Sequence, residues 1–209
     1  MRYFWPLAAG VVALVIVGVV LGIVLTRGTP GFAMQGAVSW KDLPGLQTGK
    51  PPWPANSSAL TTRLASVNLT GLPQEALAFH IHQHLDLYVD GKHVTVPRFI
   101  GIAPDSSSPS GFIITEMHTH KADGILHVES PRDLKYQLKQ FFGEWGVRLT
   151  STCMGSFKGS CKNLRWWVNG KPQVGSPANL VLKPHQEIVI SVGPPPKTIP
   201  KSYNFPAGY

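Results

Sequence analysis

Histidine is concentrated in two short segments of this chain. Of its 8 histidines, three alternate between residues 80 and 84, and three more fall between residues 118 and 127. On a β-strand, alternate residues project from the same face at intervals of about 6.5–7 Å, so such neighbours can share one ion. Imidazole, with an occasional carboxylate, suits Cu(II), Zn(II), Ni(II) and Fe(II). The spacing therefore predicts a metal-binding face, whose six histidines are His80, His82, His84, His118, His120 and His127.

A tight turn at Asp123-Gly124 would bring the second group of histidines together. If these two residues form a hairpin turn, His120 lies opposite His127. In the same register, His118 lies opposite Glu129. Directly opposed Cβ atoms are about 4.5–5.5 Å apart, a suitable separation for two ligands of one ion. Glu129 thus joins the six histidines as a predicted metal ligand.

Two other interpretations of the histidines stay open. A patch of neutral imidazoles would become strongly cationic below about pH 6.5 and could serve as a pH-responsive surface. The side chains could also be incidental surface residues, which is the interpretation that we give to His93 and His185. For the metal itself, Cu(II) is favoured because it tops the affinity order of divalent ions, and Zn(II) follows. A thioether site is not supported, because strand alternation sends Met117 to the face opposite that of His118.

Period-two alternation predicts the strands that position these side chains. It indicates a strand over residues 79–89, a hairpin at Asp90-Gly91 and a return strand over 92–96. A third strand is expected over 111–120 and a fourth over 125–129. The two histidine groups meet if the first and third strands are antiparallel neighbours, or if the first and fourth are parallel neighbours.

One main packed helix is predicted between the fourth strand and the cysteines. Ser130 can cap it, Pro131 suits its first position, and apolar residues then recur at helical intervals until Gly146 ends the pattern. A third hairpin at Asn169-Gly170 and a final strand over 187–192 follow. The fold class is therefore α+β, with a mostly antiparallel or mixed β-sheet.

The stretch Val168-Asn169-Gly170-Lys171-Pro172, followed by residues 182–190, resembles the closing half of β-grasp (ubiquitin-like) domains. The resemblance covers the C-terminal third of the chain. It implies a helix packed on a mixed sheet and a closing strand, but it implies no function, because β-grasp domains serve many functions. Residues 80–91, with the pattern His-x-His-x-His-Leu-x-x-Tyr-Val-Asp-Gly, are similar to segments of uncharacterised secreted bacterial proteins, and that likeness implies no function either.

The N-terminal segment predicts a membrane anchor. Leu7 to Leu25 is a run of 19 residues without a polar side chain, long enough as a helix to cross a hydrocarbon core of about 30 Å. We interpret residues 1–27 as an uncleaved signal anchor and the Gly- and Pro-rich residues 28–56 as a tether. A cleaved signal peptide is the alternative, with Gly31-Phe32-Ala33 as its cleavage region.

The rest of the chain is expected to form one domain outside the cytoplasm. Residues 57–194 are predicted as the histidine-rich domain and residues 195–209 as a Pro-rich tail. Cys153 and Cys161 are the only cysteines, and such a pair outside the cytosol predicts a disulfide, with two separate buried thiols as the alternative. Only 14% of residues are charged, well below the roughly 25% usual for soluble domains, which disfavours an ordinary cytosolic enzyme.

The net charge of +8 does not indicate nucleic acid. The basic residues are scattered, and the sequence contains none of the usual nucleic-acid-binding modules. An anionic membrane surface or an acidic partner is a better match for this charge.

The favoured function is a single-pass protein of the cell membrane that acquires, buffers or delivers a metal ion to a membrane partner. Seven potential ligands exceed what one catalytic ion requires. A zinc- or iron-dependent enzyme is one alternative, since Asp123 follows His118-x-His120 at the spacing of cupin-like oxygenases, although the second cupin motif is missing. A structural accessory subunit of a membrane protein complex is the other. Serine-hydrolase, P-loop and dinucleotide motifs are absent, which favours a protein that is not an enzyme.

Overall fold

The computed structural model describes residues 38–209, which have an α+β structure that is mostly sheet. Two α-helices lie in this part of the chain, α2 (Leu60–Val67) and α3 (Leu138–Trp145). None of its helices is long and apolar enough to cross a membrane. The predicted anchor at Leu7 to Leu25 lies outside the described residues.

A seven-stranded mixed sheet carries the histidines. Its central strand β2 (Phe79–Val89) has the bounds that the alternating pattern predicts. The strand order is β6-β7-β2-β10-β8-β9, and β3 also pairs with β2. The β2–β10 pair is parallel and the other pairs are antiparallel. The remaining strands are β3 (Lys92–Val94), β6 (Met117–His118), β7 (Ile125–Ser130), β8 (Arg165–Val168), β9 (Lys171–Pro172) and β10 (Glu187–Val192).

The strand expected over residues 111–120 is divided between two sheets. Its first part is β5 (Phe112–Thr115), which pairs with β1 (Gly71–Leu72) and β4 (Ile102–Pro104) in a separate three-stranded sheet. Its second part is β6, at the edge of the main sheet. The chain bends at Glu116, where the Thr115 hydroxyl donates a hydrogen bond to the Met117 carbonyl. A residue's own side chain thus competes with the strand ladder at the point where the strand breaks.

Helix α3 begins later than its capping pattern predicts. Ser130 is the last residue of β7, so it does not cap the helix. Gln137 is the N-cap and forms a reciprocal capping box with Gln140. The expected end is confirmed, because Gly146 adopts the left-handed conformation at the C-cap with a φ of 75°.

The N-terminal part of the described chain packs on the domain. Helix α2 was not predicted from the sequence, and residues 38–56 differ from the open tether that we expected. Val38, Leu43 and Trp53 are buried in the main core, because the Gly- and Pro-rich stretch also carries these large apolar side chains. Two short 3-10 helices complete the elements, Ser57–Ala59 and Pro177–Asn179.

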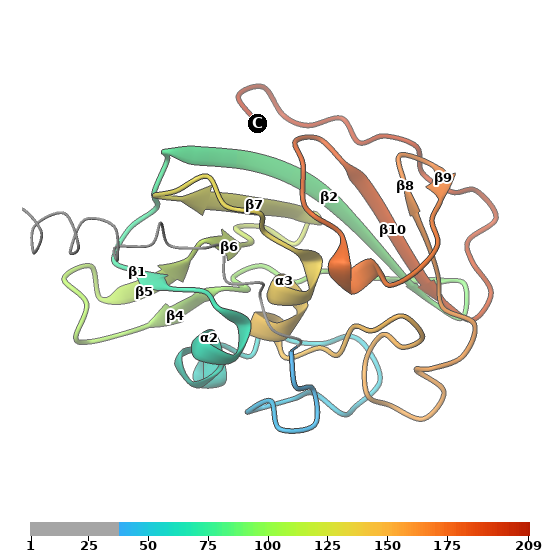
Figure 1. Ribbon diagram of the computed structural model, residues 1–209, viewed down its shortest axis with the longest axis horizontal. Coiled ribbons are helices and arrows are strands. Elements are labelled where there is room, and N and C mark those ends of the chain that lie inside the picture. Colours follow the sequence, from blue (N-terminus) through green and yellow to red (C-terminus); the bar gives the residue numbers. More distant parts are fainter. Residues whose placement is uncertain (1–37) are drawn as a thin grey trace, which may run out of the picture. The chain divides into compact units, whose positions relative to one another are not determined.

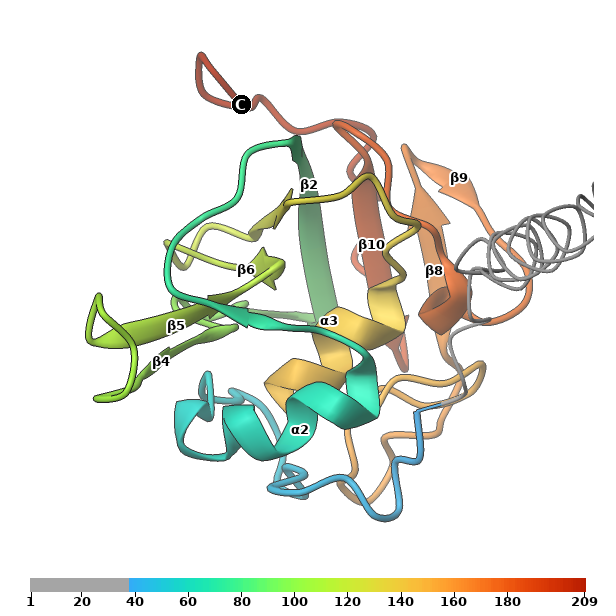
Figure 2. The same ribbon diagram turned by 60° about the vertical axis from the view of Figure 1, so that its left-hand side comes forward.

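The two faces of the main sheet have different environments. On β2, Ile81, Leu85 and Leu87 belong to the same hydrophobic core as Phe141 and Phe142 of α3. The alternate residues of β2, which include the histidines, face the other side of the sheet, where the C-terminal segment runs (Figures 1 and 2). The helices and the core therefore leave one sheet face to the histidines and the tail.

The predicted disulfide between Cys153 and Cys161 is present. It closes the loop that follows α3, and the described chain contains no free cysteine.

Candidate metal centre

The strand β7 lies between the two groups of histidines. It pairs antiparallel with β2, which places His127 opposite His82 and Glu129 opposite His80. On its other side, β7 pairs with β6, which places His127 opposite His118. Neither strand arrangement that we predicted is the observed one, because β7 separates the first strand from the third and runs antiparallel to the first. The two groups nevertheless converge on one face.

The register of the second hairpin is also shifted from the predicted one. His118, and not His120, lies opposite His127, because residues 119–124 form a loop in place of a two-residue turn. Thr119 is held by the segment before β4, where its hydroxyl donates to the Pro97 carbonyl and its backbone N–H donates to the Ile100 carbonyl. The shift is two residues, and a shift by an even number leaves every side chain on its original face.

Ring nitrogens of five histidines approach one another closely on this face. The Nε2 atom of His82 lies 3.0 Å from Nε2 of His80 and 3.1 Å from Nδ1 of His127. The Nε2 atoms of His118 and His120 are 3.1 Å apart. Donor atoms held by bonds of about 2.0–2.1 Å to a tetrahedral ion stand roughly 3.3 Å apart. The observed separations are therefore close to those that a metal imposes on its ligands.

Glu129 lies between the histidines on the β2 side of β7 and those on the β6 side. Its Oε1 atom is 3.1 Å from Nε2 of His80 and 3.2 Å from Nδ1 of His127. Its Oε2 atom is 3.8 Å from Nε2 of His118 and has no hydrogen-bond partner among the described residues. Only 4% of the Glu129 side chain is exposed. A buried carboxylate oxygen without a partner is unfavourable, and a cation beside it would remove that penalty.

His118 is held in the tautomer that a metal requires. Its ring is completely buried, and its Nδ1–H donates to the Thr115 carbonyl at a distance of 2.9 Å. The lone pair of Nε2 then points towards His120 and Glu129. A second ring nitrogen bonded to a backbone carbonyl is the usual support of a metal-binding histidine. Burial lowers the pKa of His118 to about 3, so this ligand stays neutral.

Burial and mutual repulsion keep the neighbouring imidazoles neutral as well. Burial is the larger cause for His82, and the nearby His127 adds to it, so that the pKa of His82 is lowered to about 4. The pKa of His120 is lowered by burial in the same way. Burial alone would raise the pKa of Glu129, but the hydrogen bond from His127 and the surrounding histidines lower it to about 2. Neutral imidazoles around an ionised carboxylate are the protonation states that metal binding needs.

These residues form two overlapping groups that could hold a metal ion. Within each group, the ligand atoms all lie within 4.8 Å of one another, and both groups contain His127 and Glu129. The first group is His80, His82, His127 and Glu129; the second is His118, His120, His127 and Glu129. The interpretation of the sequence as a site for a metal is thus supported by the geometry of six of its seven predicted ligands.

A scan against protein-family models, a search of curated proteins and a search of solved structures found no match for this chain. Function must therefore be inferred from the site itself.

His84, the seventh predicted ligand, lies on the same face but in a different group. Its Nδ1 is 2.8 Å from Oε2 of Glu187, and its Nε2 is 3.0 Å from the Asp123 carbonyl oxygen. A carbonyl only accepts, so Nε2 carries a proton and has no lone pair to offer. Burial lowers the pKa of His84, but the Glu187 hydrogen bond and charge outweigh it and raise the pKa. His84, Asp86 and Glu187 form a third group within metal-binding distance, in which Nδ1 is the ring nitrogen of His84 that faces the Glu187 carboxylate.

Several residues near the histidines were not identified from the sequence. The ring of Tyr209 lies 4.5 Å from that of His82, and the ring of Tyr203 stacks on that of His84 at 3.8 Å. His185, which we interpreted as an incidental surface residue, donates its backbone N–H to the His82 carbonyl, and its Nε2 lies 3.0 Å from the Tyr209 carbonyl oxygen. These contacts join segments that are distant in the chain. The aromatic residues of the Pro-rich tail are the only local feature of the sequence that points to them.

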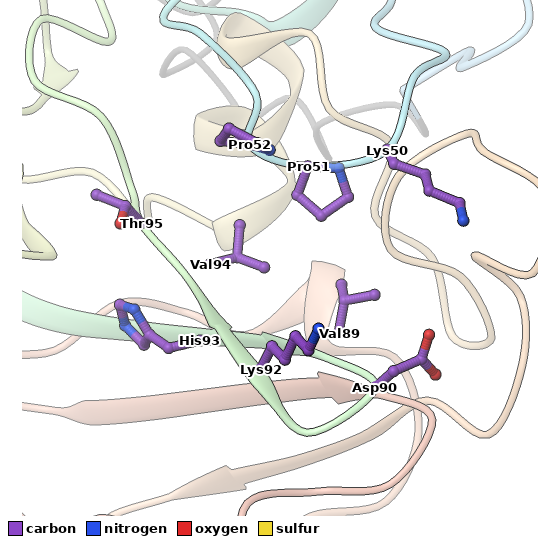
Figure 3. Close-up of a pocket in the computed structure, with 9 residues that line it drawn as sticks. All are labelled: Lys50, Pro51, Pro52, Val89, Asp90, Lys92, His93, Val94 and Thr95. Atoms are coloured by element: carbon purple, nitrogen blue, oxygen red, sulfur yellow. The ribbon is translucent and has the colours of Figure 1, made fainter.

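A pocket of about 500 Å³ lies at the β2–β3 hairpin (Figure 3), and none of the five clustered histidines lines it. His93 lines it, faces Tyr88 across the hairpin, and places its Nε2 3.1 Å from Oδ1 of Asp86. The other lining residues are Lys50, Pro51, Pro52, Val89, Asp90, Lys92, Val94 and Thr95. A single histidine lines this pocket, so it offers fewer potential metal ligands than the cluster does.

Proposed function

We propose that this protein binds a divalent transition metal, Cu(II) before Zn(II), on the histidine face and acquires, buffers or delivers it to a membrane partner. The observation that carries the proposal is the convergence of five imidazoles on the buried carboxylate of Glu129. A set of nitrogen donors with one carboxylate suits these ions, and Cu(II) is bound most tightly by such a set.

Partial exposure at the margins of the cluster supports transport in preference to permanent storage. About one third of each of the His80 and His120 side chains is exposed, while His118 and Glu129 are almost completely buried. The outer histidines are accessible to an incoming or departing ion, and the inner ligands hold it. A carrier needs both properties, because it must bind its metal selectively and still transfer it to a partner.

We further propose that the domain is held on the outer side of the cell membrane by residues 7–25. The apolar run of the sequence and the Cys153–Cys161 disulfide support this location, since disulfides persist in oxidising compartments. A β-grasp-like architecture is part of the same proposal. The mixed sheet, the parallel β2–β10 pair and the helix α3 packed on one sheet face support it.

Metal titration of the full-length protein in detergent tests the proposed function. Protein stripped with a chelator should bind Cu(II) and Zn(II) in isothermal titration calorimetry, and the double variant His120→Ala/His127→Ala should lose at least tenfold in affinity. His93→Ala is the matched control, since His93 lies outside the cluster, and it should bind like the wild type. Absence of Cu(II) and Zn(II) binding in the folded wild-type protein would refute the proposal.

A further inference from the structure

The two oxygens of Glu129 face different histidines. Oε1 lies within 3.2 Å of both His80 and His127, on the side of β2. Oε2 points towards His118, on the side of β6, and is the atom without a hydrogen-bond partner among the described residues. The carboxylate therefore offers one ligand atom to each of two separate sets of imidazoles.

The number of donors around Glu129 exceeds the requirement of one ion. A tetrahedral divalent ion takes four protein ligands at most, whereas five imidazoles and one carboxylate surround this position. The two groups share only His127 and Glu129. Each group therefore has two histidines of its own, which are His80 and His82 in one case and His118 and His120 in the other.

The shared His127 directs its Nδ1 atom towards the β2 side, although its ring centroid lies 4.6 Å from those of both His82 and His120. Its Nδ1 lies 3.1 Å from Nε2 of His82 and 3.2 Å from Oε1 of Glu129. With His127 assigned to the β2 side, that side has four donors. The β6 side has three, which are the Nε2 atoms of His118 and His120 and the Oε2 atom of Glu129.

We propose that the histidine face binds two divalent ions bridged by the carboxylate of Glu129. The ion on the β2 side is fully ligated by the protein, while the ion on the β6 side keeps one position open for water or a small anion. This inference rests on the proposed function. Paired ions in proteins stand about 3.5–4 Å apart, a separation that one carboxylate can bridge. The second ion supplies the partner that the buried Oε2 atom lacks.

The stoichiometry of Zn(II) in full-length protein distinguishes the possible outcomes. Elemental analysis after equilibrium dialysis against Zn(II) should find two ions per wild-type chain. Glu129→Gln should retain one, because an amide offers a single ligand oxygen and cannot bridge. His120→Ala should also retain one, and His93→Ala should retain two. One ion per wild-type chain would overturn this inference and leave the proposed function standing, and no ion would overturn both.

Cu(II) provides a test of the bridge itself. Two Cu(II) ions joined by one carboxylate couple magnetically, so the integrated electron paramagnetic resonance signal of the loaded wild-type protein should account for less copper than elemental analysis finds. In His120→Ala, the signal should account for all of the bound copper. His120 is one-third exposed, so this variant keeps the test valid even if Glu129→Gln fails to fold. Two Cu(II) ions per wild-type chain with a full, uncoupled signal would overturn the bridge.

Discussion

The partners of the two ring nitrogens separate the histidines of this face into two kinds. His118 donates one N–H to a carbonyl and leaves its other nitrogen free to bind a metal. His84 has both nitrogens bonded to acceptors, so its ring supports the sheet as a proton donor. Both residues occur in His-x-His patterns on predicted strands, and the sequence does not distinguish them. The difference depends on Asp123 and Glu187, which are distant in the chain and are brought beside the His84 ring only by the fold.

The depressed pKa values of the buried histidines predict a loss of stability in acid. Metal-free protein keeps His82 neutral down to about pH 4, whereas the same group in the unfolded chain takes up a proton near its ordinary pKa of 6.5. Between these two values the unfolded state binds more protons, so the free energy of unfolding falls as the pH falls. The slope from this one group approaches about 1.4 kcal/mol per pH unit. Urea unfolding from pH 7.5 to 5, followed by tryptophan fluorescence, measures it.

The variant His82→Gln is the control for this pH dependence. Glutamine does not titrate, so the variant should show a shallower decrease in stability over the same pH range. His84 contributes with the opposite sign, because its raised pKa stabilises the fold below pH 6.5 and that stability is lost as the pH rises through the folded value. Equal slopes for wild type and His82→Gln would show that His82 is not the responsible group.

Strand faces follow from local sequence, but strand neighbours and loop lengths do not. The alternation in residues 79–89 determines which side chains share a face, and β2 has the predicted bounds. The two-residue turn predicted at Asp123-Gly124 does not form, because Thr119 is bonded to Pro97 and Ile100, more than 15 residues earlier. The candidate site was still largely predictable, since a two-residue shift in register preserves the face. The start of α3 was missed for a related reason, because Ser130 continues its strand before it can cap a helix.

Gly124 joins the 119–124 loop to β7 at a point where no side chain fits. Its φ is +80°, and a Cβ atom there would stand 2.7 Å from Nε2 of His84 and 2.9 Å from the Leu85 carbonyl oxygen. Gly111 has nearly the same φ, +78°, with nothing within 4 Å of its Cβ position. Both alanine variants carry the backbone strain of a positive φ, but only Gly124→Ala adds the steric conflict. We expect Gly124→Ala to reduce the free energy of unfolding by about 1–3 kcal/mol more than Gly111→Ala does.

Chemical denaturation of the two glycine variants under one set of conditions provides this comparison. Because the strain is matched, the difference between the variants reports the close approach of β2 to the loop. Similar stabilities for Gly124→Ala and Gly111→Ala would mean that the loop relaxes freely around the added methyl group. The hydrogen bond from the Leu85 N–H to the Gly124 carbonyl would then not hold the start of β7, near His127, in a rigid position.

At the scale of the whole domain, segments from both ends of the described chain complete the site and its support. Trp53 near the beginning packs edge-to-face against Trp145 of α3, on the core side of the sheet. At the other end, the C-terminal segment runs along the histidine face (Figure 1), and the rings of Tyr209 and Tyr203 contact those of His82 and His84. Proline-rich composition led us to treat both segments as appendages. Composition describes the backbone preference of such a segment, but the few aromatic side chains within it determine where it packs.

The tail contact predicts that Tyr209 controls how quickly a metal leaves the cluster. Its ring lies 4.5 Å from the ring of His82 and 5.4 Å from that of His127, so an ion that leaves past these two ligands must displace it. Tyr209→Ala removes the ring and keeps the carbonyl that pairs with His185, so the path of the tail is preserved. We expect release of bound Zn(II) to a coloured chelator to become several-fold faster in stopped-flow measurements, with the number of bound ions unchanged.

Tyr203→Ala is the matched control, because the Tyr203 ring covers His84 and not the proposed ligands. The release rate of this variant should equal that of the wild type. Equal acceleration by both variants would show that the whole tail, and not the Tyr209 ring in particular, limits release. An unchanged rate in both would show that the metal leaves by another route, past the exposed sides of His80 and His120.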